Sequence, residues 1–198
     1  MSVTRKRIGI MGGSFNPVHT GHMIVASYIA QWSALDEVWL VLSPQNPFKK
    51  DMALTPDADR LAMLRIAVAG STCLRACDVE LSMPRPSYTI DTLRHLSAMY
   101  PDYDFTLIIG SDNWESFSRW RSPAEIISEY GLVVYPRPGH PVAGCDSEAG
   151  VVCVDAPQVE LSSTFIRRAI AEGRDMNFFL PSGVYQYIQA HGLYGAER

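Results

Sequence analysis

The stretch that decides the fold covers residues 8–22, which read IGIMGGSFNPVHTGH. Its apolar start, Ile8–Met11, predicts a buried strand, and the glycines after it predict a tight turn into a helix. Glycine lets backbone N–H groups approach a ligand closely, and a helix N-terminus attracts phosphate. His19 and His22 lie three residues apart, so on a helix they share one face at the end where an anion would bind. A glycine turn alone is common, and the pair of histidines is what favours a phosphate site.

Composition and charge restrict the class of protein. With 198 residues, of which 47% are hydrophobic, we expect one domain, with a core over about residues 7–160 and C-terminal helices over 161–198. The formal net charge of −4 argues against a nucleic-acid-binding surface, which would be basic. Apolar runs are shorter than the roughly 18 residues of a membrane helix, and the basic start leads into a strand rather than a signal-peptide core. We therefore expect a cytoplasmic protein that binds neither nucleic acid nor membrane.

Apolar runs alternate with helix-period segments along the chain. This alternation predicts an α/β fold, a Rossmann-like doubly wound parallel sheet with helices on both faces. The expected strands are 8–11, 38–42, 74–79, 105–109, 132–135 and 151–154. The expected helices are 19–33, 57–69, 89–99 and 123–129, with 164–172 and 184–190 in a small C-terminal part. Ligands of such sheets bind beyond the carboxyl ends of the strands, where the polar motifs of this chain lie.

Two of these motifs offer further groups for phosphate. The loop SPQNPFKK, residues 43–50, follows the second expected strand, and its prolines would hold Lys49 near the ligand edge of the sheet. A solvated basic loop is the alternative for this segment. The segment LSSTFIR, residues 161–167, predicts a helix capped by hydroxyl side chains, with Arg167 one turn in. Its free N–H groups and guanidinium can hold a polyphosphate, although a plain cap with a surface arginine would have the same pattern.

Two segments in the middle of the chain suggest a site for a second ligand. The stretch SYTIDTL, residues 87–93, predicts a loop that enters a helix near Thr89, with free N–H groups at the positive end of the helix. A capped amphipathic helix without a ligand is the alternative. Gly110 and Asp112 follow the fourth expected strand, and Trp120 lies eight residues after Asp112. Core packing is the alternative for a lone tryptophan.

These segments resemble the motifs of one enzyme superfamily. GSFNPVHTGH is similar to the nucleotide-binding signature of the nucleotidyltransferases, with its His-x-Gly-His element, and SSTFIR is similar to their Ser-Ser-Thr-x-Ile-Arg motif. The stretch SYTIDT and the tryptophan after Gly-x-Asp resemble the bacterial nicotinate-nucleotide adenylyltransferases in particular. The likeness spans residues 7–187. Three positions depart from the family pattern: Asn16 replaces the commoner Asp, Phe48 the usual His, and Arg121 a frequent aromatic residue or His.

The resemblance implies adenylyl transfer from ATP to nicotinate mononucleotide, which yields nicotinate adenine dinucleotide and pyrophosphate on the route to NAD. The catalytic residues that it implies are His19, His22, Lys49 and Arg167. The residues implied for ATP binding are Gly12, Gly13, Ser14, Phe15, His19, His22, Gly110, Asp112, Ser162, Ser163, Thr164 and Arg167. Those implied for nicotinate mononucleotide are Ser14, Lys49, Tyr88, Thr89, Trp120 and Arg137. No protein metal site is expected, because Mg²⁺ would be held mainly by the phosphates of ATP.

Two other functions stay open at this point. The first is a different transfer, onto nicotinamide mononucleotide or phosphopantetheine, or of a cytidylyl group; the 87–93 stretch and Trp120 argue against it. The second is a nucleotide-binding sensor without turnover. A sensor could bind ATP without paired imidazoles, so His19 and His22 argue against it. The sequence also leaves open a homo-oligomer.

Overall fold

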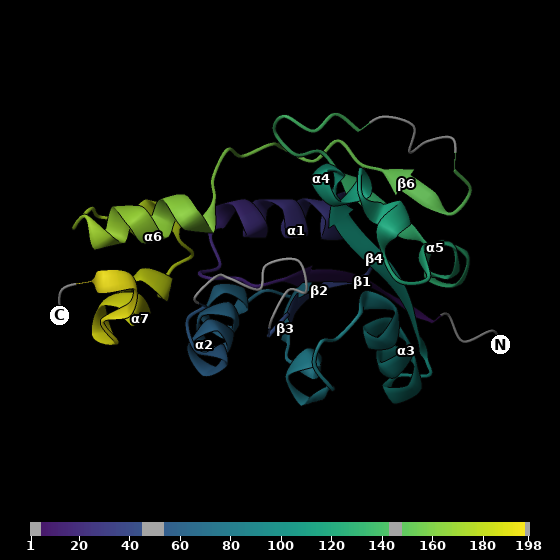
Figure 1. Ribbon diagram of the computed structural model, residues 1–198, viewed down its shortest axis with the longest axis horizontal. Coiled ribbons are helices and arrows are strands. Elements are labelled where there is room, and N and C mark those ends of the chain that lie inside the picture. Colours follow the sequence, from purple (N-terminus) through teal and green to yellow (C-terminus); the bar gives the residue numbers. More distant parts are fainter. Residues whose placement is uncertain (1–4, 45–53, 143–147, 197–198) are drawn as a thin grey trace.

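The computed structural model describes residues 5–44, 54–142 and 148–196. Its centre is an all-parallel sheet with the strand order β3-β2-β1-β4-β5-β6 (Figure 1). The strands are β1 (Lys6–Gly13), β2 (Glu37–Leu42), β3 (Leu74–Cys77), β4 (Tyr103–Gly110), β5 (Leu132–Tyr135) and β6 (Val151–Cys153). This order is that of a doubly wound Rossmann-like sheet, and the fold class predicted from the sequence is confirmed.

Helices cover both faces of the sheet (Figure 1). One core contains buried side chains of α1 (Thr20–Trp32), α2 (Asp57–Val68), α6 (Ser163–Ala171) and α7 (Val184–Ala190), and the other contains those of α3 (Thr89–Met99) and α5 (Pro123–Tyr130). Along β1, Ile10 belongs to one core and Met11 to the other. Because successive strand residues point to opposite faces, a sheet covered on both sides needs such continuous apolar runs.

The observed boundaries differ from the expected ones near the site. The strand expected over 8–11 continues through Gly12 and Gly13, which the sequence placed in a turn. Two further differences involve polar side chains. The helix expected from His19 begins at Thr20, because the backbone of His19 is extended, with φ −141°. The strand expected over 74–79 ends at Cys77 and is followed by a short 3₁₀ helix, Val79–Ser82. As a result, His19 lies directly before α1, and Glu80 lies in the 3₁₀ helix that follows β3.

The carboxyl ends of β1 and β4 meet at the point where the strand order reverses. β1 pairs with β2 on one side and with β4 on the other. The chain therefore crosses to opposite faces after these two strands, and a crevice opens between the loops that follow them. The short helix α4 (Ser111–Trp114) continues directly from β4 at this edge. None of the helices in the described ranges has the length and apolar character needed to cross a bilayer.

Candidate active site

His19 and His22 lie together at the start of α1. Their ring centroids are 3.6 Å apart, and the ring planes differ by 26°. The backbone N–H of His19 donates a hydrogen bond to Nδ1 of His22 at 3.2 Å. Because Nδ1 is the acceptor, a neutral His22 carries its proton on Nε2. The ring therefore presents an N–H donor at its other nitrogen, which suits a phosphate oxygen.

Burial keeps both imidazoles neutral. Together with a smaller contribution from the nearby guanidinium of Arg137, it lowers the pKa of His19 to about 4. Burial also lowers the pKa of His22 well below its usual range, with smaller contributions from His19 and Arg137. Both rings are thus uncharged at pH 7 in the free protein. A bound polyphosphate would supply the negative charge that favours their protonated forms.

The glycine turn after β1 is supported by Phe15. This side chain is only 2% exposed, and its backbone has a positive φ of 42°, which non-glycine residues seldom adopt. A Cβ on Gly13 would lie 2.8–3.1 Å from atoms of the Phe15 ring, so only glycine lets the ring pack under the turn. The same ring meets His22 edge-on at 5.1 Å between centroids. Phe15 therefore shapes the turn and supports His22, and it lines neither of the two cavities described below.

The N-terminus of α6 packs against this turn. Ser162 is the N-cap, and its Oγ accepts the N–H of Phe165 at 3.2 Å. The hydroxyl of Ser163 donates to the carbonyl of Pro17 at 2.9 Å. The bond from Ser163 attaches the second phosphate motif to the first, although the two motifs lie far apart in the sequence.

Arg167 joins the two motifs directly. Its Nη1 donates to the carbonyl of Asn16 at 2.8 Å, and its Nη2 donates to Oγ1 of Thr164 at 3.3 Å. Asn16 is 1% exposed, and its Oδ1 accepts the hydroxyl of Tyr194 at 2.9 Å and the N–H of Thr55 at 3.3 Å. The amide that departs from the family pattern thus links the turn to the C-terminal part of the chain.

Three buried side-chain atoms without a hydrogen-bond partner in the described part of the chain lie on the segments of this site. They are Nδ1 of His19, Nδ2 of Asn16 and Oδ1 of Asp112. Buried polar atoms are nearly always paired in folded proteins, and exceptions need an explanation. A polar ligand that binds here would provide the missing partners.

Arg137 lies with the phosphate motifs. Its side chain covers Gly110, where a Cβ would come within 2.8 Å of Cγ of Arg137. Its Nε is 3.8 Å from Oδ1 of Asp112, and it lines a small second cavity together with His19. Trp120, Tyr88 and Thr89 do not line this cavity. Arg137 thus lines a different cavity from Trp120, Tyr88 and Thr89, although it lies against Gly110, which lines the same cavity as they do.

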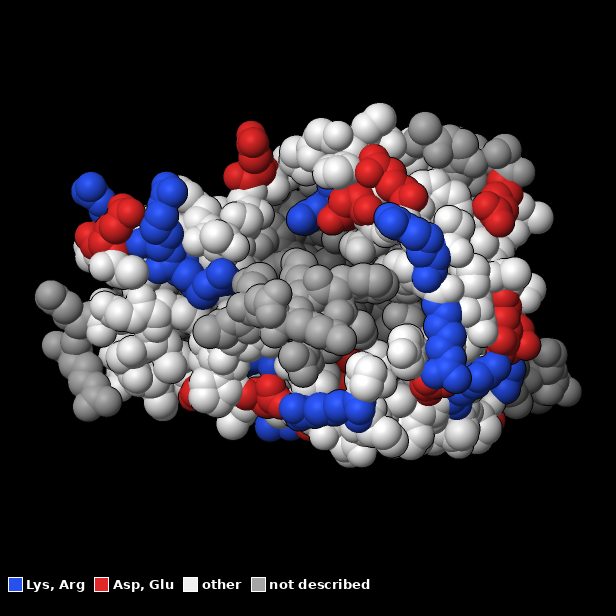
Figure 2. All heavy atoms as spheres, viewed as in Figure 1, with Lys and Arg blue, Asp and Glu red and all other residues white. Residues whose placement is uncertain are grey.

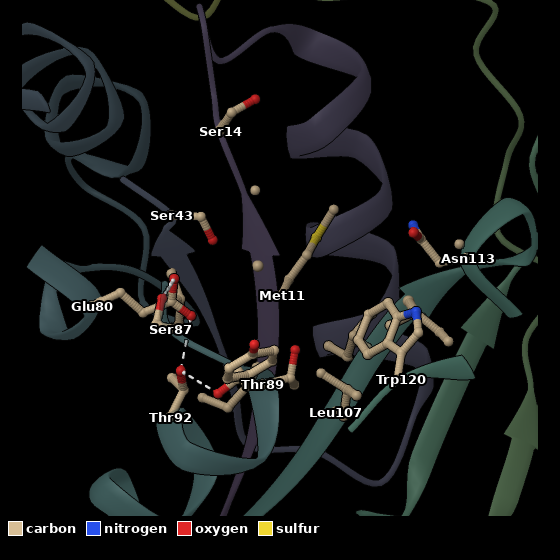
Figure 3. Close-up of a pocket in the computed structure, with 18 of the residues that line it drawn as sticks. Met11, Ser14, Ser43, Glu80, Ser87, Thr89, Thr92, Leu107, Asn113 and Trp120 are labelled. Carbon is tan, nitrogen blue, oxygen red and sulfur yellow. Dashed lines mark hydrogen bonds between the residues drawn. The ribbon is translucent and has the colours of Figure 1, made fainter. Parts of the chain in front are cut away.

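A larger cavity of about 220 Å³ opens beyond the carboxyl ends of β1, β2 and β4. Trp120 forms one side, and the N-terminus of α3, with Thr89, faces it across the apolar side chains of Met11 and Leu107 (Figure 3). Gly12 and Gly13 at the end of β1, Ser14 and Gly110 line the same cavity, so it adjoins the turn that follows β1. In the surface view, Lys and Arg side chains lie around the middle of this face, with Asp and Glu side chains among them (Figure 2). The cavity can take a flat ring that carries an anionic group.

Glu80 is a cavity residue that the sequence reasoning missed. It is 8% exposed; its Oε1 accepts the hydroxyl of Thr92 at 2.9 Å, and its Oε2 accepts that of Ser87 at 3.2 Å (Figure 3). These bonds hold the loop before α3 in place. An acidic residue directly after an expected strand was the only available signal.

Arg60, in α2, is a second missed residue. Its side chain is fully buried, and it donates to four backbone carbonyls and forms an ion pair with Asp57. The carbonyls belong to Ser14, Ser43, Pro44 and Thr55. Arg60 thus fixes the ends of the loops that follow β1 and β2. Lys49, expected in the second of these loops, lies outside the described residues, as does Phe48.

A site that can hold a triphosphate beside a cavity for a second substrate is that of a nucleotidyltransferase, and a family model described as cytidylyltransferase-like matches residues 10–169. A probable nicotinate-nucleotide adenylyltransferase of Bacteroides fragilis is 46% identical over 94% of this chain and 92% of its own length. A probable nicotinate-nucleotide adenylyltransferase of Cytophaga hutchinsonii is 41% identical over 95% of this chain and 98% of its own length. The chain therefore belongs to the nicotinate-nucleotide adenylyltransferase family.

Solved structures agree with this fold. The nicotinic acid mononucleotide adenylyltransferase of Plasmodium falciparum, in a complex with NaAD, superposes with a TM-score of 0.79. The match covers 97% of this chain and 98% of that one, at 21% sequence identity. A nicotinate-nucleotide adenylyltransferase assigned in Vibrio parahaemolyticus superposes with a TM-score of 0.72 at 23% identity. At these identities the likeness establishes the shared fold.

Proposed function

We propose that this enzyme transfers the adenylyl group of ATP to nicotinate mononucleotide, in the biosynthesis of NAD. The observation that carries the proposal is that Arg167 and Ser163, near the C-terminal end, bond to carbonyls of the segment that leads to His19 and His22. The end of β1, directly before this segment, lines a cavity with an aromatic side chain and a helix N-terminus. The phosphate groups suit ATP, and the cavity suits a pyridine ring with a carboxylate. The names of the curated relatives support this pair of substrates.

The reaction needs no general base. A phosphate oxygen of nicotinate mononucleotide attacks the α-phosphorus of ATP, the bond to the β-phosphate breaks, and pyrophosphate leaves with the electron pair. The attacking phosphate is already largely dianionic at neutral pH, because its second pKa is about 6. Catalysis then consists of positioning the two phosphates and stabilising the charge that develops between them.

We assign the phosphate contacts as follows. The Nε2–H of His22 donates to the α-phosphate and to the charge that develops there, and His19 holds the phosphates at the turn. Arg167 and the N–H groups at the start of α6 take the β- and γ-phosphates, whose charge grows as pyrophosphate departs. Lys49 is expected to add a further cation. Arg137 is assigned to the ATP side, because it lies against His19 and Asp112.

The pyridine ring is assigned to the larger cavity. Trp120 offers a face on which the ring can stack. The ring carboxylate would face the N–H groups at the start of α3, near Tyr88 and Thr89, where the positive end of the helix stabilises an anion. A neutral carboxamide gains less at such a position. Ser14, which lines the larger cavity, is assigned to the phosphate of the mononucleotide.

Mg²⁺ fits this site only as an ion carried by the nucleotide. No three His, Cys, Asp or Glu side chains in the described part of the chain gather to hold a metal. Mg²⁺ usually keeps several waters and binds through substrate phosphates, so it needs no such cage. Oδ1 of Asp112, which is buried and lacks a hydrogen-bond partner among the described residues, could accept one of those waters. Bound Mg²⁺ would neutralise charge on the departing pyrophosphate.

The release of pyrophosphate from ATP in the presence of candidate acceptors tests the proposal. We expect release with ATP and nicotinate mononucleotide together, and none with either alone. Faster release with nicotinamide mononucleotide or phosphopantetheine would replace the proposed acceptor. ATP binding without release would favour the sensor. The cytoplasmic location, the single domain and the homo-oligomer stay predictions.

A further inference from the structure

Arg121 is held at the N-terminus of α3, on the rim of the larger cavity. Its guanidinium carbon lies 4.8 Å from the centre of the Tyr88 ring. Its Nη1 is 3.2 Å from Oδ2 of Asp91. Tyr88 is the N-cap of α3, and Asp91 lies in the first turn, so the two contacts stand on either side of Thr89. Arg121 itself lines the cavity, next to Trp120.

The positive end of α3 and the guanidinium therefore face the same part of the cavity. The first backbone bond of the helix runs from the N–H of Asp91 to the carbonyl of Tyr88, at 2.9 Å. The N–H groups of Thr89 and Ile90 precede that bond and have no partner within the helix. A guanidinium offers several N–H donors in a planar fork, and the contact with Asp91 uses only part of them. Both groups favour an anion in this position.

The other charged side chains of the cavity leave an excess of positive charge. The carboxylate of Glu80 keeps its negative charge, which the hydroxyls of Ser87 and Thr92 stabilise, and it opposes one of the two arginines that line the cavity. Arg119, the remaining charged lining residue, adds a second positive charge. The charge of the lining thus favours an acid over an amide.

We propose that Arg121 determines substrate specificity: its guanidinium attracts the ring carboxylate of nicotinate mononucleotide and so contributes to the preference for the acid over the amide. This inference rests on the proposed function. The Arg121 side chain is 55% exposed, so solvent screens the attraction. Half-exposed ion pairs of this kind change affinities by about two- to fivefold.

Three variants test the proposal, with kcat/KM measured for nicotinate and nicotinamide mononucleotides at saturating ATP. Arg121→Gln removes the charge, and Arg121→Lys keeps it. Arg94→Gln is the matched control, because Arg94 is similarly exposed, also lies near Asp91, at 3.9 Å, and does not line the cavity. We expect the acid-to-amide ratio to fall by about two- to fivefold in Arg121→Gln, mainly through the KM of the acid. The ratio should be largely kept in Arg121→Lys and unchanged in Arg94→Gln.

Salt and direct binding separate this role from a structural one. The wild-type ratio should fall as ionic strength rises, and the ratio of Arg121→Gln should respond less. Calorimetric titration of each mononucleotide should show the same loss for the acid alone. A ratio in Arg121→Gln equal to that of the wild type, or an equal loss for both substrates, would overturn the inference. A wild-type enzyme that uses neither mononucleotide would instead overturn the proposed function.

Discussion

At the scale of single residues, the site depends on imidazoles that burial keeps neutral. The backbone bond to Nδ1 fixes which nitrogen of His22 donates, and stacking on His19 fixes the plane of the ring. Both restraints exist before a ligand binds. Donors placed in advance need no reorganisation when charge develops on a phosphate, which is the largest single contribution in many enzymes.

Replacing His22 by alanine tests this role. We expect kcat for pyrophosphate release to fall by about 10²–10³, because one preorganised donor to the reacting phosphate is lost. His95→Ala, at an exposed position of α3, is the control and should keep its activity. Circular dichroism should show that both variants are folded. A His22→Ala enzyme with near-normal kcat would remove His22 from the mechanism.

The lowered pKa values also predict how stability depends on pH. The unfolded chain binds a proton at His19 below about pH 6.5, whereas the folded protein does so only near pH 4. Between these values the unfolded state binds more protons, so the free energy of unfolding should fall as the pH is lowered from 6.5 to 4. The slope from each such imidazole is at most about 1.4 kcal/mol per pH unit. Urea unfolding at several pH values measures it, and His19→Gln should have a shallower slope; equal slopes would contradict this account.

At the scale of elements, the strands and helices were predictable because apolar periodicity decides them. β2 is buried along its whole length, as its continuous apolar run predicts. The errors lie at ends, as at Cys77, where the Val79 side chain stays in the core although the strand has stopped. The sequence did not indicate which polar side chains would be buried by tertiary contacts. Arg60 is an example, because it reaches the carbonyls of Ser14 and Ser43 only after the loops that follow β1 and β2 have come together. No local pattern carries that information.

Arg60 gives a prediction at this scale. Arg60→Met should lower the free energy of unfolding by about 3–5 kcal/mol, because it leaves buried carbonyls without donors and Asp57 without its buried partner. Arg65→Met is the control on the same helix, since Arg65 is exposed and pairs with the exposed Asp78. Arg65→Met should lower the free energy of unfolding by no more than about 1 kcal/mol. Urea unfolding compares the two; equal losses would show that Arg60 does not hold the loops.

At the scale of the whole molecule, the phosphate motifs converge because the C-terminal part packs back onto the turn after β1. The motif SSTFIR was visible in the sequence, and the resemblance predicted that it joins the histidines. The means of joining were not visible: the bonds from Ser163 and Arg167 end on backbone carbonyls, which every sequence has. The position of Arg137 could not be predicted from the sequence either, because its side chain meets Gly110 only in the folded molecule.

A crystal structure of the enzyme with an unreactive ATP analogue and nicotinate mononucleotide tests the convergence most directly. We expect one triphosphate to accept hydrogen bonds from both His22 and Arg167, with the pyridine ring on Trp120. A triphosphate that contacts one of these two residues and not the other, or that binds elsewhere, would contradict the account.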